Sequence, residues 1–392
     1  MVQTVRIDEA GIDAALRHAT ETGAIAGAVA MATNANETIY RACFGVADRS
    51  TRKPLGADAI FRLASMTKAI TSVAAMQLVE RGKLNLDGPI AAVLPHLAAP
   101  MVLDGFDGPM PRLRPAARPI TLRHLLTHTA GFGYDVWNAE LKRATDALGL
   151  PARPSTIDEL ARFPLLFDPG ARWNYSIATD IVGHAIEAAS GMAIDTYLAT
   201  HVTGPLGMAD TTFTLTDAQR ARLVAVHQRQ PDGSLAAGDR PAGNGPAFLA
   251  GGGGLCSTAG DYTRFLRMLL RGGTLDGARI LAADTVAAMA RNHIGAAEVV
   301  KMHSAIPASS YDCELFPGMV TKWGLGFLIN TEAGPDGRSA GSLAWAGLVN
   351  TYFWADSVAG IAGVLLTQSL PFADPKVLSL LGALERGVYG RA

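Results

Sequence analysis

A serine and a lysine lie three residues apart in this chain, a spacing suited to nucleophilic catalysis. Ser65 and Lys68 open segment 65–80, whose apolar residues recur at helical spacing. At the start of a helix these two positions share one side, so the Lys68 amine can reach the Ser65 hydroxyl. A buried lysine loses its charge readily, and the neutral amine then takes the serine proton. The unpaired N–H groups of the first helical turn would bind the oxyanion formed in acyl transfer.

The same spacing occurs a second time, in segment 50–53 (Ser-Thr-Arg-Lys). That segment is polar and turn-like and ends at Pro54, so we interpret it as a solvated loop. Ser65 also has a purely structural alternative, a helix-capping serine followed by a surface lysine, because such a short motif recurs by accident. Only the other motifs of the chain can distinguish a nucleophilic Ser65 from a helix-capping one.

A competing esterase signal is segment 337–341, Gly-Arg-Ser-Ala-Gly, which has the form GxSxG. In α/β-hydrolases this motif follows a strand, precedes a helix, and requires the order serine, acid, histidine. The last histidine in the chain is His303, which precedes Ser339. The required order is therefore impossible, and Ser339 is predicted to be a hairpin residue.

Two further patterns are weak as ligand sites. His124 and His128 lie one helical turn apart, but the glutamate of a zinc HExxH motif is missing and no third ligand stands out. We therefore predict a capped or core histidine pair and no bound metal. Glycines 251–254 lack the Lys-Ser/Thr of a phosphate loop, and are predicted to allow close backbone packing beside a site or a strand.

Several segments together resemble the serine β-lactamase and penicillin-binding protein superfamily, and within it the class C β-lactamase-like esterases known as family VIII carboxylesterases. The resemblance covers roughly residues 20–390, and each motif is weak alone, but their order and spacing make an accident very unlikely. The matching segments are 61–68 (FRLASMTK), 124–131 (HLLTHTAG), 167–170 (FDPG), 173–176 (WNYS), 205–208 (PLGM), 253–261 (GGLCSTAGD) and 345–347 (WAG).

The resemblance implies a role for each matching residue. Ser65 is implied to be the acylated nucleophile, Lys68 its hydrogen-bonded partner, and Tyr175 the phenol that exchanges a proton with nucleophile and leaving group. Whether Lys68 or Tyr175 is the formal base stays open at this point. The backbone N–H groups of Ser65 and Leu348 are implied to form the oxyanion hole. The residues expected to contact substrate are Trp345, Gly347, Ile177 and Tyr134.

Two departures from the family pattern bear on the substrate. The second motif is often Tyr-x-Asn, but here Ile177 stands at the asparagine position, and Trp345 replaces the usual lysine or histidine of the third motif. Both changes remove polar anchors and favour uncharged, short-chain esters. The sequence therefore predicts a serine carboxylesterase that forms an acyl-Ser65 intermediate, with weak cephalosporin hydrolysis as a side activity. The alternatives are a β-lactamase, a D-amino-acid peptidase or lactone hydrolase on the same fold, and a non-catalytic binding protein.

The elements that must position these residues occur at both ends of the chain. Strand-like segments at 27–33 and 37–44 form a predicted hairpin, and a meander is expected over 324–330, 342–349, 351–355 and 360–367. Helices are predicted at 7–22, 65–80, 258–270 and 376–388, whereas 85–250 shows short helices, including 158–162 and 178–190, and no clear strand ladder.

This distribution predicts an α+β, β-lactamase/transpeptidase-like fold: an antiparallel sheet flanked by helices, with an inserted, mostly helical domain. Residues 1–60 and 250–392 are expected to form the discontinuous sheet domain. Residues 61–249 are expected to form the helical domain, with the active site at the interface between the two.

Composition excludes several partners. The 392 residues carry a net charge of −1 with no basic cluster, which argues against nucleic acid or an anionic membrane. Three isolated cysteines fit a reducing compartment, and the first residues do not resemble a signal peptide, so a cytoplasmic location is expected. The expected partner is a small-molecule ester. No cofactor is implied, and the sequence leaves the oligomeric state open.

Overall fold

The computed structural model describes residues 7–152, 154–238 and 249–391, and its centre is an eight-stranded sheet. The strand order is β12-β13-β14-β15-β16-β1-β2-β3, and all neighbours are antiparallel. The chain therefore closes one sheet from its two ends. The strands are β1 (Gly27–Asn34), β2 (Thr38–Asp48), β3 (Lys53–Pro54), β12 (Thr321–Trp323), β13 (Leu328–Asn330), β14 (Leu343–Gly347), β15 (Thr351–Asp356) and β16 (Ile361–Leu366).

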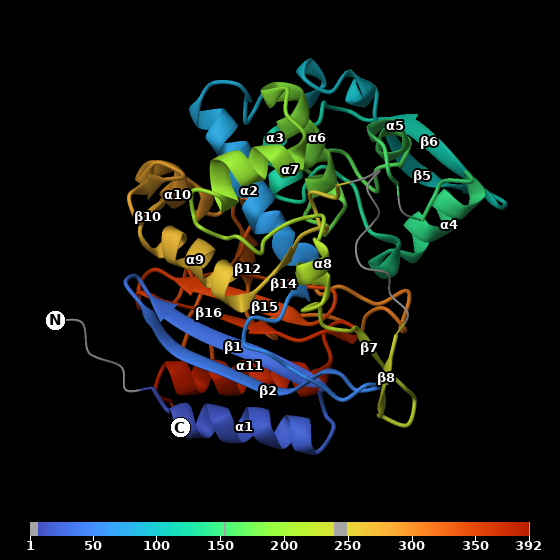
Figure 1. Ribbon diagram of the computed structural model, residues 1–392. Coiled ribbons are helices and arrows are strands. Elements are labelled where there is room, and N and C mark those ends of the chain that lie inside the picture. The colour runs from blue at the N-terminus through green and yellow to red at the C-terminus, as the bar shows by residue number, and fades with distance from the viewer. Residues whose placement is uncertain (1–6, 153, 239–248, 392) are drawn as a thin grey trace.

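Helices cover both faces of this sheet, which explains why its central strands are apolar without alternation. Every residue of β15 and β16 is buried. Helices α1 (Glu9–Glu21) and α11 (Pro375–Val388) pack together on one face, and α9 (Ala259–Leu270) packs on β1 and β16 from the other (Figure 1). The predicted hairpin, meander and flanking helices are thus confirmed.

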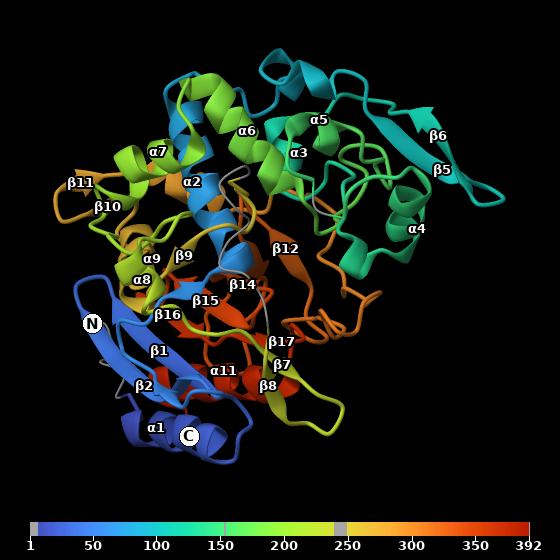
Figure 2. The same ribbon diagram turned by 45° about the vertical axis from the view of Figure 1, so that its right-hand side comes forward.

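A mostly helical region lies above the sheet in both views (Figures 1 and 2). At its centre is α2, which is buried almost throughout and touches α6 and α7. The helices are α2 (Thr67–Glu80), α3 (Leu122–Leu126), α4 (Ala139–Ala147), α5 (Ile157–Ala161), α6 (Ala178–Ser190), α7 (Ile194–Leu198) and α8 (Asp217–Arg220), with 3₁₀ turns at Ile90–Ala92, Pro95–Leu97 and Asp135–Trp137 and a π turn at Ala199–Thr203; α10 (Ala283–Met289) follows later in the chain, beyond the small hairpin of β10 (Thr274–Leu275) and β11 (Ala278–Arg279).

The prediction that 85–250 contains no strand ladder is wrong. Strands β5 (Met101–Asp107) and β6 (Met110–Pro115) form an antiparallel hairpin at the edge of the molecule (Figure 2), and β7 (His227–Arg229) pairs with β8 (Leu235–Ala237) and with β17 (Ser369–Leu370). Most residues of the first hairpin are partly buried or exposed; β5 carries aspartate and glycine, and β6 carries proline and arginine. Because Val102 is the one buried residue of these two strands, the sequence lacks the apolar alternation that identifies a strand.

The predicted architecture, an antiparallel sheet flanked by helices with a helical insertion, is confirmed. Strand β4 (Phe61–Arg62) pairs with β9 (Cys256–Ser257) where the chain enters and leaves that insertion. The division into domains at residues 60 and 250 stays a prediction. Among the residues described, no helix is long and apolar enough to cross a bilayer.

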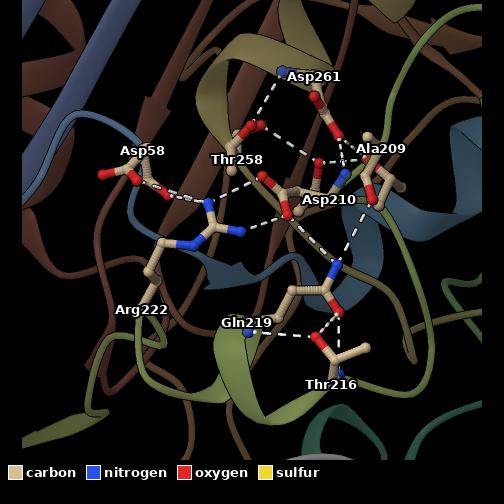
Figure 3. Close-up of polar contacts among 10 residues, drawn as sticks. Asp58, Ala209, Asp210, Thr216, Gln219, Arg222, Thr258 and Asp261 are labelled. Atoms are coloured by element: carbon tan, nitrogen blue, oxygen red, sulfur yellow. Dashed lines mark hydrogen bonds and ion pairs between the residues drawn. The ribbon is translucent and has the colours of Figure 1, made fainter.

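A polar cluster fastens segment 209–222 onto the start of α9 (Figure 3). Asp261, in the first turn of α9, accepts the backbone N–H of Asp210 at 2.8 Å. Arg222 donates to the Asp210 carboxylate at 2.8 Å and lies 3.6 Å from Asp58, and it lowers the pKa of Asp210. Thr258 caps the helix by accepting the N–H of Asp261. The cluster is a structural tie between two surface segments and the helix.

A buried ion pair joins α11 to the turn before β14. Arg338 and Glu385 are 5% and 6% exposed, and Arg338 Nε donates to Glu385 at 2.7 Å. Replacing Glu385 by alanine leaves a buried guanidinium without its partner, so we expect a loss of about 3–5 kcal/mol in the free energy of unfolding, measured by urea denaturation. The double variant Arg338→Met/Glu385→Leu should lose much less. Equal losses in the two variants would contradict the role of the unpaired charge.

Candidate active site

Ser65 lies in a short 3₁₀ turn, η1 (Ala64–Met66), that runs directly into α2. The sequence placed Ser65 as the first residue of the helix itself, so the structure differs by one turn. Ala64 has a φ of +46°, in the left-handed region that residues other than glycine seldom adopt. The backbone is held there by Leu63, whose N–H donates to Leu255 at 2.9 Å. Backbone strain of this kind is typical of functional sites.

Lys68 is almost completely buried and has an acceptor for each of its three donor positions. Only 1% of the residue is exposed. Its Nζ lies 3.1 Å from Ser65 Oγ, 3.0 Å from the Tyr134 hydroxyl and 2.7 Å from the Gly252 carbonyl oxygen. An ammonium group donates to all three. A neutral amine keeps its bond to the carbonyl and can turn its lone pair to the Ser65 hydroxyl.

Tyr134 was expected to contact substrate, and in the structure it also contacts the Ser65–Lys68 pair. Its hydroxyl meets Lys68 directly, and burial together with the nearby Tyr175 raises its pKa well above the usual value for a phenol. Tyr134 therefore stays protonated at neutral pH. Its hydroxyl can donate to a neutral Lys68 or accept from the ammonium, so it satisfies Lys68 in either state.

Tyr175 lies beside the same amine, with its hydroxyl turned to Trp345. Lys68 Nζ is 5.0 Å from the centroid of the Tyr175 ring. The indole Nε1–H of Trp345, on β14, donates to the Tyr175 hydroxyl oxygen at 3.1 Å. The interpretation of Trp345 as a purely apolar ring is therefore incomplete, because its N–H can stabilise negative charge on the phenol oxygen.

An aromatic cluster surrounds Tyr175, and His128 belongs to it. The His128 ring meets the Tyr175 ring edge-on with centroids 4.9 Å apart, and its Nδ1 lies 3.1 Å from Ser176 Oγ. Burial, and secondarily the charge of Lys68, holds the pKa of His128 well below its usual value. His128 is thus a neutral core histidine. The other rings within reach of Tyr175 belong to Trp137, Tyr134, Trp173 and Trp345.

The end of β14 approaches the chain just before Ser65. A Cβ on Gly347 would lie 2.2 Å from the Leu63 carbonyl oxygen, so only glycine allows this approach. Thr351 Oγ1 donates to the same carbonyl at 3.1 Å. This brings the turn containing Leu348 to the start of η1, where the predicted oxyanion hole would form. The oxyanion role of the Ser65 and Leu348 amides stays a prediction.

Ile177, predicted to line the substrate site, is a core residue at the start of α6. It is 6% exposed and belongs to the main apolar cluster. The position where the family has asparagine therefore supplies no polar group to Lys68. Besides Ser65, the hydrogen-bond partners of Lys68 are Tyr134 and Gly252.

The other candidate motifs have structural roles. His124 completes the cap of α3: Thr121 accepts its N–H, and the His124 ring accepts the N–H of Thr121. In the described ranges no three His, Cys, Asp or Glu side chains come close enough to hold a metal. Ser339 lies in the turn between β13 and β14, as predicted for a hairpin residue, and its N–H donates to Asp356 at 2.7 Å.

Four contacts of the site were not anticipated from the sequence. They are the Tyr134 hydroxyl and the Gly252 carbonyl on Lys68, the Trp345 N–H on Tyr175, and the Ser176–His128 pair. The glycine run at 251–254 was expected only to permit close packing, which it does, since Gly251 lies against Gly183 of α6. A run of glycines predicts that the backbone approaches another segment closely, but it does not predict which carbonyl bonds to Lys68.

A narrow pocket adjoins the tryptophans beside Tyr175. Trp173 and Trp345 form one wall, and Glu314 is its one acidic residue. The other lining residues are mostly apolar: Val299, Val300, Met302, Cys313, Leu315, Phe316, Met319, Thr321 and Leu328. Aliphatic and aromatic side chains thus make up most of the lining beside these tryptophans.

Comparison with known proteins identifies the family of the chain. The family model described as Beta-lactamase matches residues 12–384. The chain is 34% identical to monacolin J acid methylbutanoyltransferase of Aspergillus terreus (97% of this chain, 95% of that protein) and 32% identical to lovastatin esterase of Penicillium rubens (96% and 98%). A variant of simvastatin synthase from Aspergillus terreus superimposes with a TM-score of 0.83 at 32% identity, covering 97% of this chain and 96% of that structure.

Proposed function

The chain belongs to the beta-lactamase family of enzymes, and from that premise we propose that it is a serine carboxylesterase acting on short-chain, uncharged esters. The observation that carries the proposal is the contact between Ser65 Oγ and the buried Lys68 Nζ at 3.1 Å. A hydroxyl beside a buried amine is one of the arrangements that activate a serine nucleophile. Esterase and acyltransferase relatives, similar over nearly the whole chain, support the same reaction class.

In the proposed reaction Ser65 Oγ attacks the ester carbonyl carbon while its proton passes to the base. The base is Lys68 in its neutral form or the Tyr175 phenolate, whose charge the Trp345 N–H and the Lys68 ammonium would stabilise. The backbone N–H groups of Ser65 and Leu348 hold the oxyanion. The C–O bond to the alcohol then breaks, and the alcohol leaves with the proton. Water repeats the sequence on acyl-Ser65 and releases the acid.

The apolar surroundings favour an uncharged substrate. Trp345 occupies the position from which a lysine would bind a substrate carboxylate, and the adjoining pocket is mostly apolar. Weak cephalosporin hydrolysis remains part of the proposal as a side activity, since the same acylation opens a β-lactam ring.

Acyl transfer to an alcohol is the second candidate. It uses the same acyl-Ser65 and differs only in whether water or an alcohol attacks it. The names of the relatives include both an esterase and a methylbutanoyltransferase, which is the observation that favours keeping both. Adding butanol to the assay and measuring butyl ester against free acid would separate the two.

The proposal is tested with p-nitrophenyl butyrate, nitrocefin and a D-alanyl-D-alanine peptide. We expect hydrolysis of the ester with a kcat/KM well above that for the other two, and a fluorophosphonate adduct on Ser65 in peptide mapping. A protein that neither cleaves the ester nor forms the adduct would be a non-catalytic member of the family. Preference for nitrocefin or the peptide would reassign the substrate while keeping the nucleophile.

The Trp345 contact gives a testable prediction of its own. Trp345→Phe keeps an aromatic ring but removes the N–H donated to Tyr175, so kcat for p-nitrophenyl butyrate should fall about 3- to 10-fold. Trp137→Phe is the matched control, because its ring also contacts Tyr175 while its N–H donates to Ser310 instead. If both variants lose the same activity, the Trp345 hydrogen bond has no special part in the reaction.

A further inference from the structure

The amine of Lys68 lies in the interior of the protein. The residue is buried, and none of the ion pairs recorded among the described residues includes it. Its direct partners are two hydroxyls and a carbonyl. Burying an ammonium group is costly unless nearby groups compensate the charge and fix its geometry. Such compensation has to come from beyond the direct contacts.

Asp180, in the first turn of α6, is linked to Lys68 through a single residue, Gly252, to which both side chains bond. Its Oδ1 accepts the N–H of Gly252 at 2.8 Å, and the carbonyl of the same glycine accepts Lys68 Nζ at 2.7 Å. A Cβ at position 252 would lie 3.0 Å from Asp180 Oδ1, so glycine is what allows the carboxylate to come this close. The neighbouring Gly251 carbonyl is held as well, by Thr71 Oγ1 at 2.6 Å.

An acidic residue in the first turn of a helix has an ordinary explanation, because it stabilises the helix dipole. A helix-dipole role does not require a bond to Gly252, which lies 72 positions away in sequence. Nor does it require that the residue bonded to Asp180 also bonds to Lys68. Asp261 provides the comparison within this chain. It occupies the same position of α9 and its carboxylate accepts a distant N–H, that of Asp210 (Figure 3), and the hydroxyl of Thr211; no bond from it to Gly252 or Lys68 is present among the described residues.

We propose that Asp180 is a positioning residue for Lys68: it fixes Gly252 so that its carbonyl holds the amine beside Ser65, and it supplies negative charge near the buried ammonium. The inference rests on the proposed serine hydrolase function and deepens it. Asp180 does not touch the reacting atoms. It acts through one backbone residue, and its removal should therefore change the rate of acylation more than the binding of substrate.

Several other titratable groups lie near Asp180 and Lys68. Lys68 faces Tyr134, Tyr175 and His128, of which Tyr134 is protonated and His128 neutral at pH 7. The charge of Asp135 contributes to raising the pKa of Tyr134, and the charge of His184 works to lower the pKa of Asp180. Burial raises the pKa of Asp180, and the attraction of Lys68 opposes this effect. The mutual attraction of Asp180 and Lys68 is consistent with a counter-charge.

The test uses three variants of the full chain and p-nitrophenyl butyrate. Asp180→Ala removes both the acceptor and the charge, and a displaced Lys68 should lower kcat about 30-fold with KM changed less than twofold. Asp180→Asn keeps an oxygen for the Gly252 N–H, so kcat should recover to within about threefold of the parent. Losing the negative charge disfavours a protonated base, so the acid limb of the Asn variant's pH–rate profile should move about half a unit to lower pH.

Asp261→Ala is the matched control and should lose stability without losing kcat. A kcat within twofold of the parent for Asp180→Ala would overturn the proposal, and so would an Asp180→Asn profile that superimposes on the parent profile. If Asp180→Ala does not fold, the Asn profile alone decides. Failure of the proposed function is distinguishable: the parent protein itself would then form no fluorophosphonate adduct at Ser65.

Discussion

Replacing Ser65 by alanine is expected to lower kcat/KM for p-nitrophenyl butyrate by about 10⁴-fold or more, to the level set by binding and the oxyanion site alone. The physical reason is that no other hydroxyl among the Lys68 contacts can take over. Tyr134 is the alternative hydroxyl, and its raised pKa makes it a poor nucleophile at neutral pH. The mass of the protein after mixing with a fluorophosphonate should show one adduct in the parent and none in the variant.

The chain contains its own controls for this experiment. Ser50 belongs to the second Ser-x-x-Lys segment, and Ser339 to the GxSxG segment. Ser50 bonds to Asp48 in an exposed turn, and Ser339 lies in a hairpin turn. Ser50→Ala and Ser339→Ala should keep full activity. Loss of activity in either, or retention in Ser65→Ala, would show that the nucleophile has been wrongly assigned.

Lys68→Met should lower kcat by about 10³-fold, since general-base catalysis contributes on the order of 10²- to 10⁴-fold. Methionine keeps the apolar stem in a site that is 1% exposed, so the fold is expected to survive. The variant loses the amine that contacts Ser65, Tyr134 and Gly252 together. Thermal unfolding measured beside kcat separates lost chemistry from lost structure.

Lys53→Met is the matched control, because Lys53 is the lysine of the other Ser-x-x-Lys segment and bonds to the Ala221 carbonyl at the surface. It should leave kcat unchanged. A Lys68→Met variant that retained a tenth of the activity would mean that Tyr175 alone can serve as the base. Tyr175→Phe would then be the variant with the larger loss.

The sequence was most informative where burial is one-sided or complete. The hairpin of β1 and β2, the strands from β13 to β16, and helices α1, α9 and α11 were all predictable, because their apolar patterns and caps are local. The β5–β6 hairpin was missed for the opposite reason. Only one of its residues, Val102, is buried, so its pattern lacks the apolar alternation that marks a strand.

In the site, the motif residues and the contact between Ser65 and Lys68 could be predicted, because the two residues are three positions apart, but the long-range contacts could not. Tyr134 and Gly252 meet Lys68 across 66 and 184 positions of sequence. No local pattern determines which tyrosine or which glycine carbonyl contacts the amine. Those contacts follow from how α2 packs against α6 and the glycine run, which is a property of the assembled core.

The pairing of β1 with β16 has a consequence for folding during synthesis. Val29 lies opposite Leu366, a separation of 337 residues (366 − 29). At about 5–20 residues per second, a ribosome needs roughly 20–70 seconds to proceed from β1 to its partner β16. During that interval the edge of β1 that pairs with β16 is open. Nascent chains should therefore depend on chaperone protection until β16 has been synthesised.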